Sequence, residues 1–230
     1  MPDVNVNVDW LQQETSYYCG PAVAQMMLTA LGAASPTLPP TWQDQLWEVV
    51  KNKTAATRPA GAPTSVSPPG FPKQLCEICS GQWGCWSTTP QVLEYLLGAY
   101  QTVADYSVSS PAQQKAATAL ILDTLDRQLP ALALVRGWQH WLVVEGYRFN
   151  EAGSALVGGR NFNGVYVRDP WALESVHYIK RQKWFSEYMD FVPCGIFHGT
   201  FVVLGGVKTA VVAPQQAPPV IPKPRKKARR

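Results

Sequence analysis

The chain has 230 residues, of which 46% are hydrophobic and 16% are charged, a balance typical of a folded globular protein and not of a disordered one. The net charge is +4, but six basic side chains lie in the last nine residues, PKPRKKARR, so the rest of the chain carries about −2. That near-neutral body excludes the broad basic face of a nucleic-acid-binding domain.

The sequence predicts neither an N-terminal secretory signal nor a membrane-spanning segment. MPDVNVNVDW lacks the basic and apolar regions of a secretory signal, and no apolar run reaches the ~18 residues that a membrane span needs. The five cysteines are an odd number, which argues against a fully paired secreted disulfide framework. We expect a cytoplasmic protein, or one exported without a recognisable signal peptide.

The first half of the chain is predicted to be mainly helical. The segment VNVNVDW alternates apolar and polar residues and is typical of a strand over residues 4–10. Four stretches then have helical composition, with Ser, Thr or Pro at their starts. We expect helices over residues 21–31, 41–52, 87–100 and 109–128, the last capped by Ser109 or Ser110. Residues 54–73 are rich in Pro, Ala, Gly, Ser and Thr and indicate a loop.

The second half contains short apolar runs separated by Gly, Pro and Asn, which are typical of antiparallel strands. We expect strands within residues 130–137, 140–149, 164–171 and 194–206. Helices followed by strands predict an α+β fold. We expect one domain over residues 1–208, with an inserted Pro- and Cys-containing segment at about 54–85, and a disordered Pro-rich basic tail over residues 209–230.

Cys19 lies at the start of the first expected helix, in the segment QQETSYYCGPAVAQMML. The backbone N–H groups and the dipole of a helix N-terminus stabilise a thiolate, which is the nucleophilic form of cysteine. Gly20 allows the chain to turn tightly in front of the sulfur. The alternative is a cysteine that only fills space in the core.

A thiolate enzyme also needs a general base and a group that orients the base. Of the three histidines, His140 begins the strand-like run HWLVVEGY. Asp169 follows the strand-like run GVYVR, so its carboxylate can fix the tautomer of His140 from the far ring nitrogen. The alternatives are a core histidine and an aspartate that opens a turn. We expect His177 and His198 to be structural.

Four segments of the chain resemble the papain-like cysteine peptidases, in particular their bacteriocin-processing, double-glycine-type branch. QQETSYYCGPA resembles the nucleophile segment Gln-x5-Cys-Gly-x-Ala, and GWQHWLVVEGY resembles the histidine strand. GVYVRDPW resembles the Asp-Pro segment, and GCWSTTPQVLEYLL resembles a helix start between them. The resemblance implies a bacterial thiol hydrolase of papain-like fold, in which N-terminal helices pack on a C-terminal antiparallel sheet and the central helix carries the nucleophile.

Position by position, the resemblance implies that Cys19 is the nucleophile, His140 the base and Asp169 the orienting acid. It implies that Gln13, six residues before the cysteine, supplies an oxyanion-hole amide, with Gln12 as the alternative in the adjacent register. The backbone N–H of Cys19 is the second expected oxyanion donor. Two departures are Trp138-Gln139, where the family has glycine before the histidine, and a long insertion between residues 35 and 84.

The segment CEICSGQWGC places Cys76, Cys79 and Cys85 in a C-x2-C-x5-C arrangement. Such spacing suits a zinc knuckle, which Cys194 or a histidine would complete. A labile disulfide or unpaired loop thiols are the alternatives, because one C-x2-C without a second pair is a weak signal. We predict no other metal and no cofactor.

The sequence predicts a cysteine peptidase that hydrolyses peptide bonds through an acyl-enzyme, with a peptide or protein as its substrate. The same residues would serve an acyl transferase or a deamidase effector, and a non-catalytic peptide-binding module is a third possibility. We expect the basic tail to contact an acidic partner or nucleic acid, or to serve only as a solubilising end. Oligomeric state and the cleavage motif stay open.

Overall fold

The structure is a computed structural model of the whole chain. The residues that it describes are 3–32, 42–56, 76–79, 82–85, 88–100, 103–137, 139–149, 156–172, 176–193 and 197–209. Across these ranges, no helix combines the length and the apolar character that crossing a membrane requires.

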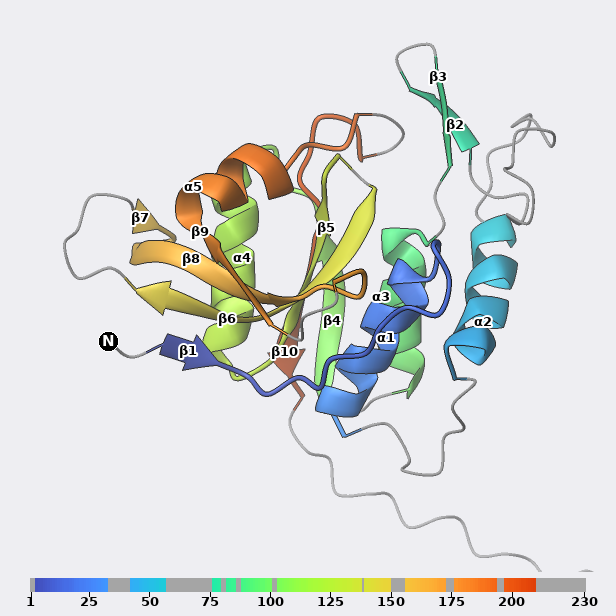
Figure 1. Ribbon diagram of the computed structural model, residues 1–230, viewed down its shortest axis with the longest axis horizontal. Helices are drawn as coiled ribbons and strands as arrows, with labels where there is room; N and C mark the ends of the chain where they lie inside the picture. The colour runs from blue at the N-terminus through green and yellow to red at the C-terminus, as the bar shows by residue number, and fades with distance from the viewer. Residues whose placement is uncertain are drawn as a thin grey trace, which may run out of the picture.

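Helices dominate the first half of the chain, and strands dominate the second (Figure 1). The helices are α1 (Cys19–Ala30), α2 (Trp42–Ala56), α3 (Pro90–Tyr100), α4 (Gln114–Asp126), α5 (Arg181–Lys183) and the π-helix η1 (Trp184–Tyr188). The strands are β1 (Asp3–Asn5), β2 (Cys76–Cys79), β3 (Gln82–Cys85), β4 (Ala104–Ser109), β5 (Ala131–Val135), β6 (His140–Phe149), β7 (Leu156–Val157), β8 (Arg160–Arg168), β9 (His177–Lys180) and β10 (Val203–Lys208).

Eight of these strands form one antiparallel sheet in the order β4-β10-β5-β6-β8-β7, with β1 also paired to β6 and β9 also paired to β8. The last strand in the sequence, β10, lies between β4 and β5. Val203 is therefore opposite both Ser109 of β4 and Ala133 of β5. The strands β2 and β3 form a separate hairpin.

Apolar side chains cover both faces of the central strands. In β5, Leu132 and Leu134 belong to the core on one face, whereas Ala133 and Val135 belong to the core on the other face. Helices α1, α2 and α3 complete the first core, and α4 and η1 complete the second (Figure 1). Because both faces are buried, β5 and β6 appear in the sequence as continuous apolar runs and not as alternating patterns.

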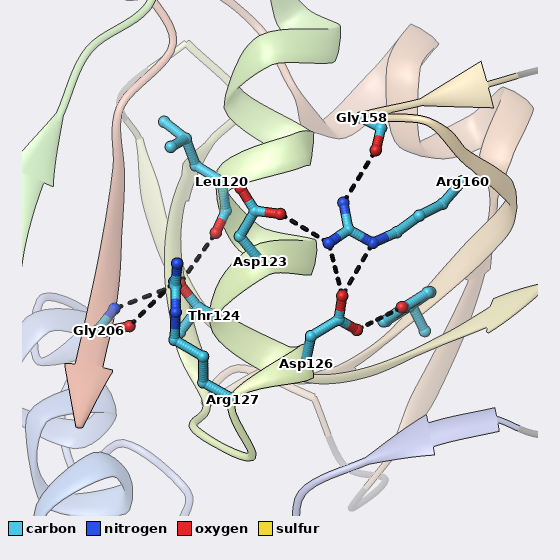
Figure 2. Close-up of polar contacts among 9 residues, drawn as sticks. Leu120, Asp123, Thr124, Asp126, Arg127, Gly158, Arg160 and Gly206 are labelled. Atoms are coloured by element: carbon cyan, nitrogen blue, oxygen red, sulfur yellow. Dashed lines mark hydrogen bonds and ion pairs between the residues drawn. The ribbon is translucent and has the colours of Figure 1, made fainter.

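A polar cluster joins α4 to two strands on the face of the sheet that α4 covers (Figure 2). Arg160, the first residue of β8, pairs with Asp123 at 2.7 Å and with Asp126 at 2.5 Å. The hydroxyl of Tyr147, on β6, donates to Asp126 at 2.6 Å. One guanidinium and one carboxylate therefore connect α4, β6 and β8, on the face of the sheet opposite to α1.

The α+β prediction is confirmed, but several predicted element bounds are wrong. The expected strand over 4–10 is limited to β1, although the N–H of Val6 still donates to the carbonyl of Glu145 at 2.7 Å. Helix α2 continues to Ala56, so residues 54–56, expected to begin a loop, are helical, as their Thr-Ala-Ala sequence permits. Residues 57–73 of that expected loop lie outside the described residues.

The start of the predicted helix over 109–128 is wrong. Ser109 ends β4, and α4 begins at Gln114 after the cap residue Gln113. Strand β4 buries Ala104 and Tyr106 and exposes the residues after each of them. This short alternation gives a weak sequence signal, and the strand is stabilised by pairing with β10, which is remote in sequence.

The Cys-containing segment forms the hairpin of β2 and β3, where Cys76 is opposite Cys85 and Cys79 is opposite Gln82. The side chains of these cysteines, and Cys194, lie outside the described residues, so zinc binding stays a prediction. Strand β10 ends at Lys208, the predicted domain boundary. Residues 210–230 of the predicted tail lie outside the described residues, and its disorder also stays a prediction.

Candidate active site

Cys19 is the first residue of α1, two residues before the expected helix start, and the residue is 6% exposed. Pro21 fits the first turn, where backbone N–H groups have no acceptor within the helix. Gly20 is required by packing, because a Cβ atom there would lie 2.1 Å from the Oγ1 atom of Thr88. The sulfur therefore lies at the N-terminus of a helix that packs closely against the start of α3.

His140 is the first residue of β6 and is paired in register with Val135 across a tight connection from β5. Arg136 and Gly137 in this connection have φ values of 55° and 59°, a left-handed conformation that is uncommon for arginine. The N–H of Arg136 donates to the carbonyl of Tyr188 at 2.8 Å, which fixes the turn. The side chain of His140 is 1% exposed.

Asp169 directly follows β8, and its Oδ1 atom lies 2.7 Å from the Nε2 atom of His140. The same oxygen accepts the N–H of Trp171 at 2.8 Å. The ring of Trp171 stacks on the imidazole, with centroids 4.7 Å apart and an interplanar angle of 16°. Trp171 is 49% exposed, so it shields the histidine from solvent. The sequence analysis assigns Trp171 no role, because an aromatic residue just after a strand is too common to indicate a contact with the histidine.

The charges around His140 favour its protonated form. Burial lowers the pKa of His140, but the hydrogen bonds and negative charges of Asp169 and Cys19 outweigh burial and raise the pKa from 6.5 to about 9. For Asp169, burial raises the pKa, but the hydrogen bond and positive charge of His140 lower it below its ordinary value. At neutral pH the pair is therefore an imidazolium and a carboxylate.

The thiol of Cys19 contacts the ring of His140 closely enough to raise the pKa of the imidazole. Because Asp169 binds Nε2, we assign the contact of Cys19 to Nδ1. That nitrogen is buried and has no hydrogen-bond partner of good geometry among the described residues. We interpret the contact with the sulfur as a long, poorly aligned hydrogen bond, a common state of a nucleophile and its base before the substrate binds.

Gln13 lies in the loop before α1, and the residue is 8% exposed. The Nε2 atom donates to the carbonyl of Thr15 at 2.6 Å, whereas Oε1 has no partner among the described residues. The orientation of this amide is fixed, because a rotated amide would place two oxygens against each other. The side chain of Gln12 is exposed. The buried amide therefore belongs to Gln13, the residue that the sequence favours.

Two hydrogen bonds attach this loop to the turn after β8. The indole N–H of Trp10 donates to the carbonyl of Asp169 at 2.9 Å, and the N–H of Gln13 donates to the carbonyl of Pro170 at 3.0 Å. These hydrogen bonds therefore hold the loop that carries the amide of Gln13 against the turn that carries the carboxylate of Asp169.

The two remaining histidines lie elsewhere in the fold. His177 is partly buried in β9, as expected of a structural residue, whereas His198 is exposed in a turn before β10, which contradicts its predicted strand position. Within the described ranges, no group of three or more His, Cys, Asp or Glu side chains is arranged to hold a metal ion.

Comparison with known proteins gives one match to a protein family. A sequence model of the Peptidase_C39 like family matches residues 5–191. Similar solved structures include a putative C39-like peptidase from Bacillus anthracis, with 14% identity, coverage of 91% of this chain and 100% of that chain, and a TM-score of 0.49. Another is a double glycine motif protease from an AMS/PCAT transporter in complex with the leader peptide, with 12% identity, coverage of 91% and 99%, and a TM-score of 0.48. A third is the peptidase domain of Streptococcus ComA, with 17% identity, coverage of 86% and 98%, and a TM-score of 0.45. No curated protein sequence matches the chain.

Proposed function

This chain belongs to the Peptidase_C39 like family and is a papain-like cysteine peptidase, and we propose that it hydrolyses peptide bonds through an acyl-enzyme formed on Cys19. The observation that carries the proposal is the connected set of Cys19, His140 and Asp169, in which both partners of the histidine raise its pKa. The three side chains come from the start of a helix, the start of a strand and the end of a strand. Such a set suits nucleophilic attack by a thiolate.

The roles follow from the proton positions. With its pKa raised to about 9, the imidazole of His140 is protonated near neutral pH, and a neighbouring imidazolium stabilises the thiolate of Cys19. After the sulfur attacks the substrate carbonyl carbon, the Nδ1–H of His140 is placed to protonate the leaving amine. Water then attacks the thioester, with the now neutral His140 as the base that removes its proton. Asp169 keeps the ring oriented by accepting from Nε2 throughout.

The negative oxygen of the tetrahedral intermediate requires hydrogen-bond donors. Gln13 is the proposed side-chain donor, because its NH₂ group has two N–H bonds and only one of them is needed for the carbonyl of Thr15. The backbone N–H of Cys19 is the second proposed donor, because the first N–H groups of a helix point outward along its axis. One such donor contributes roughly 3 kcal/mol to the transition state.

The contact between Cys19 and His140 supports an enzyme over a module that only binds peptides. The test is a peptide library incubated with the protein and analysed by mass spectrometry. Hydrolysis gives two fragments that together contain one added water, whereas transfer and deamidation give other product masses. We expect Cys19→Ala to abolish cleavage and to remove the fastest step of alkylation by iodoacetamide, leaving only the reaction of the other four cysteines. Full cleavage by this variant would overturn the proposal.

A further inference from the structure

The side chain of Gln43 contacts the loop that carries Gln13 at two points. Gln43 is the second residue of α2 and is 3% exposed. Its Oε1 atom accepts the N–H of Glu14 at 3.1 Å, and its Nε2 atom donates to the carbonyl of Gln12 at 2.9 Å. The two backbone groups that it binds belong to the residues immediately before and after Gln13.

These contacts need the chemistry of a glutamine. A backbone N–H only donates and a backbone carbonyl only accepts, so the side chain must supply one acceptor and one donor together. A glutamate at position 43 would lose the donor and would place a carboxylate beside the carbonyl of Gln12. A leucine of similar size would lose both bonds and would leave two backbone groups without partners.

The neighbouring side chains of α2 contact the rest of the same loop. Asp44 accepts the hydroxyl of Tyr18 at 2.7 Å. The ring of Trp47 packs against Tyr17 and Tyr18, with centroids 5.2 Å and 5.3 Å away. Because Gln43 and Trp47 are four residues apart, they lie on one face of the helix. This face of α2 therefore supports the loop from Gln12 to the residue before Cys19.

We propose that Gln43 is a positioning residue that fixes the oxyanion donor Gln13. An oxyanion donor is effective only when its N–H already points to the place where negative charge develops. The backbone of Gln13 is held on one side by the carbonyl of Pro170 and on both flanks by Gln43. The inference rests on the proposed function, and it assigns a catalytic contribution to α2, a helix of the long insertion of this chain.

The test is a double-mutant cycle between Gln43→Leu and Gln13→Ala, measured as cleavage of the peptide that the wild-type protein cleaves fastest in the library. We expect Gln13→Ala to lower kcat about 10²-fold. We expect Gln43→Leu to lower kcat about tenfold with little change in KM, because misplacement of a transition-state donor leaves substrate binding intact. In the Gln13→Ala background, Gln43→Leu should lower kcat by less than about twofold, because the donor that it positions is already absent.

Two controls separate positioning from damage to the fold. Gln45→Leu makes the same chemical change at an exposed position of the same helix, and it should leave kcat unchanged. Alkylation of Cys19 by iodoacetamide involves no oxyanion, so its rate should be the same in Gln43→Leu as in the wild-type protein. A Gln43→Glu variant should lose activity at least as strongly as Gln43→Leu.

The outcomes distinguish this inference from the proposed function. If Gln43→Leu lowers kcat by the same factor in the wild-type protein and in Gln13→Ala, the positioning role is overturned. Full activity of the Gln43→Leu single variant would overturn it too. In either case, dependence of cleavage on Cys19 would leave the peptidase proposal standing. Cleavage that survives Cys19→Ala would instead overturn the peptidase proposal itself.

Discussion

Replacing Asp169 with asparagine removes the charge that keeps His140 protonated and nearly preserves the shape of the side chain. The pKa of His140 is raised from 6.5 to about 9, which corresponds to about 3 kcal/mol in favour of the imidazolium. Cys19 supplies part of this, and burial, which acts in the opposite direction, persists in the variant. If Asp169 supplies half, its removal weakens the imidazolium by about 1.5 kcal/mol, which lowers the ratio of imidazolium to neutral imidazole roughly tenfold at a given pH.

The assay is the rate at which iodoacetamide alkylates Cys19 across the pH range, since only the thiolate reacts. In the wild-type protein, the profile should change slope near pH 9, where His140 loses its proton. In Asp169→Asn this change should move to lower pH by about one unit. Peptide cleavage should also fall, because the asparagine fails to hold the reactive tautomer of the ring.

The matched control is Asp105→Asn, which makes the same change on the exposed side of β4 and should leave the profile unaltered. The reasoning is refuted if the profile of a folded Asp169→Asn variant coincides with that of the wild-type protein. Asp169 would then not be the group that holds the proton on His140.

Four further predictions concern stability and the surroundings of the site. The stability advantage of the wild-type protein over Asp169→Asn, measured by urea unfolding, should be greatest where Asp169 is ionised and His140 is protonated. It should be lost as the pH rises through about 9, where the ring loses its proton, and also in acid, where the carboxylate with its lowered pKa becomes protonated. Gly20→Ala places a methyl group 2.1 Å from a threonine hydroxyl and should lower the free energy of unfolding by about 1–3 kcal/mol; an unchanged urea midpoint would contradict this close packing. Trp171→Ala removes the indole that stacks on the base and should lower kcat/KM several-fold, whereas Trp171→Phe should retain most of it. Arg160→Ala should lower the free energy of unfolding by about 1 kcal/mol, since its ion pairs are partly exposed, and should leave peptide cleavage unchanged; a loss of cleavage would show that the face of the sheet that α4 covers acts on the site.

The candidate site could be predicted because each of its members carries a local signal. Cys19 precedes an apolar helix, His140 begins an apolar strand, and Asp169 ends another strand beside a proline. The contact between the last two follows from antiparallel pairing. Since Val143 of β6 is opposite Arg168 of β8, the beginning of one strand lies beside the end of the other.

The sequence does not predict strand β4 or the contacts of Gln43 and Trp171. Each of them depends on a partner that is remote in the sequence or that no residue pattern marks. Strand β4 is stabilised by β10, which follows it by about a hundred residues in the chain. Gln43 binds backbone groups, which every residue type has, so no residue pattern marks its target. Trp171 stacks on a ring, and an aromatic residue after a strand is too common to indicate such a contact.

The position of β10 in the middle of the sheet has a consequence for synthesis of the protein on the ribosome. Strands β4 and β5 have no direct pairing in the sheet order and are joined only through β10. Until residues 203–208 leave the ribosome, the edge of β5 that faces β10 lacks its partner, although the segments bearing Cys19, His140 and Asp169 have already been made. The nascent chain therefore carries every proposed catalytic group before it can complete the sheet that supports them, and we expect peptidase activity to appear only after residues 203–208 have left the ribosome and paired with β5.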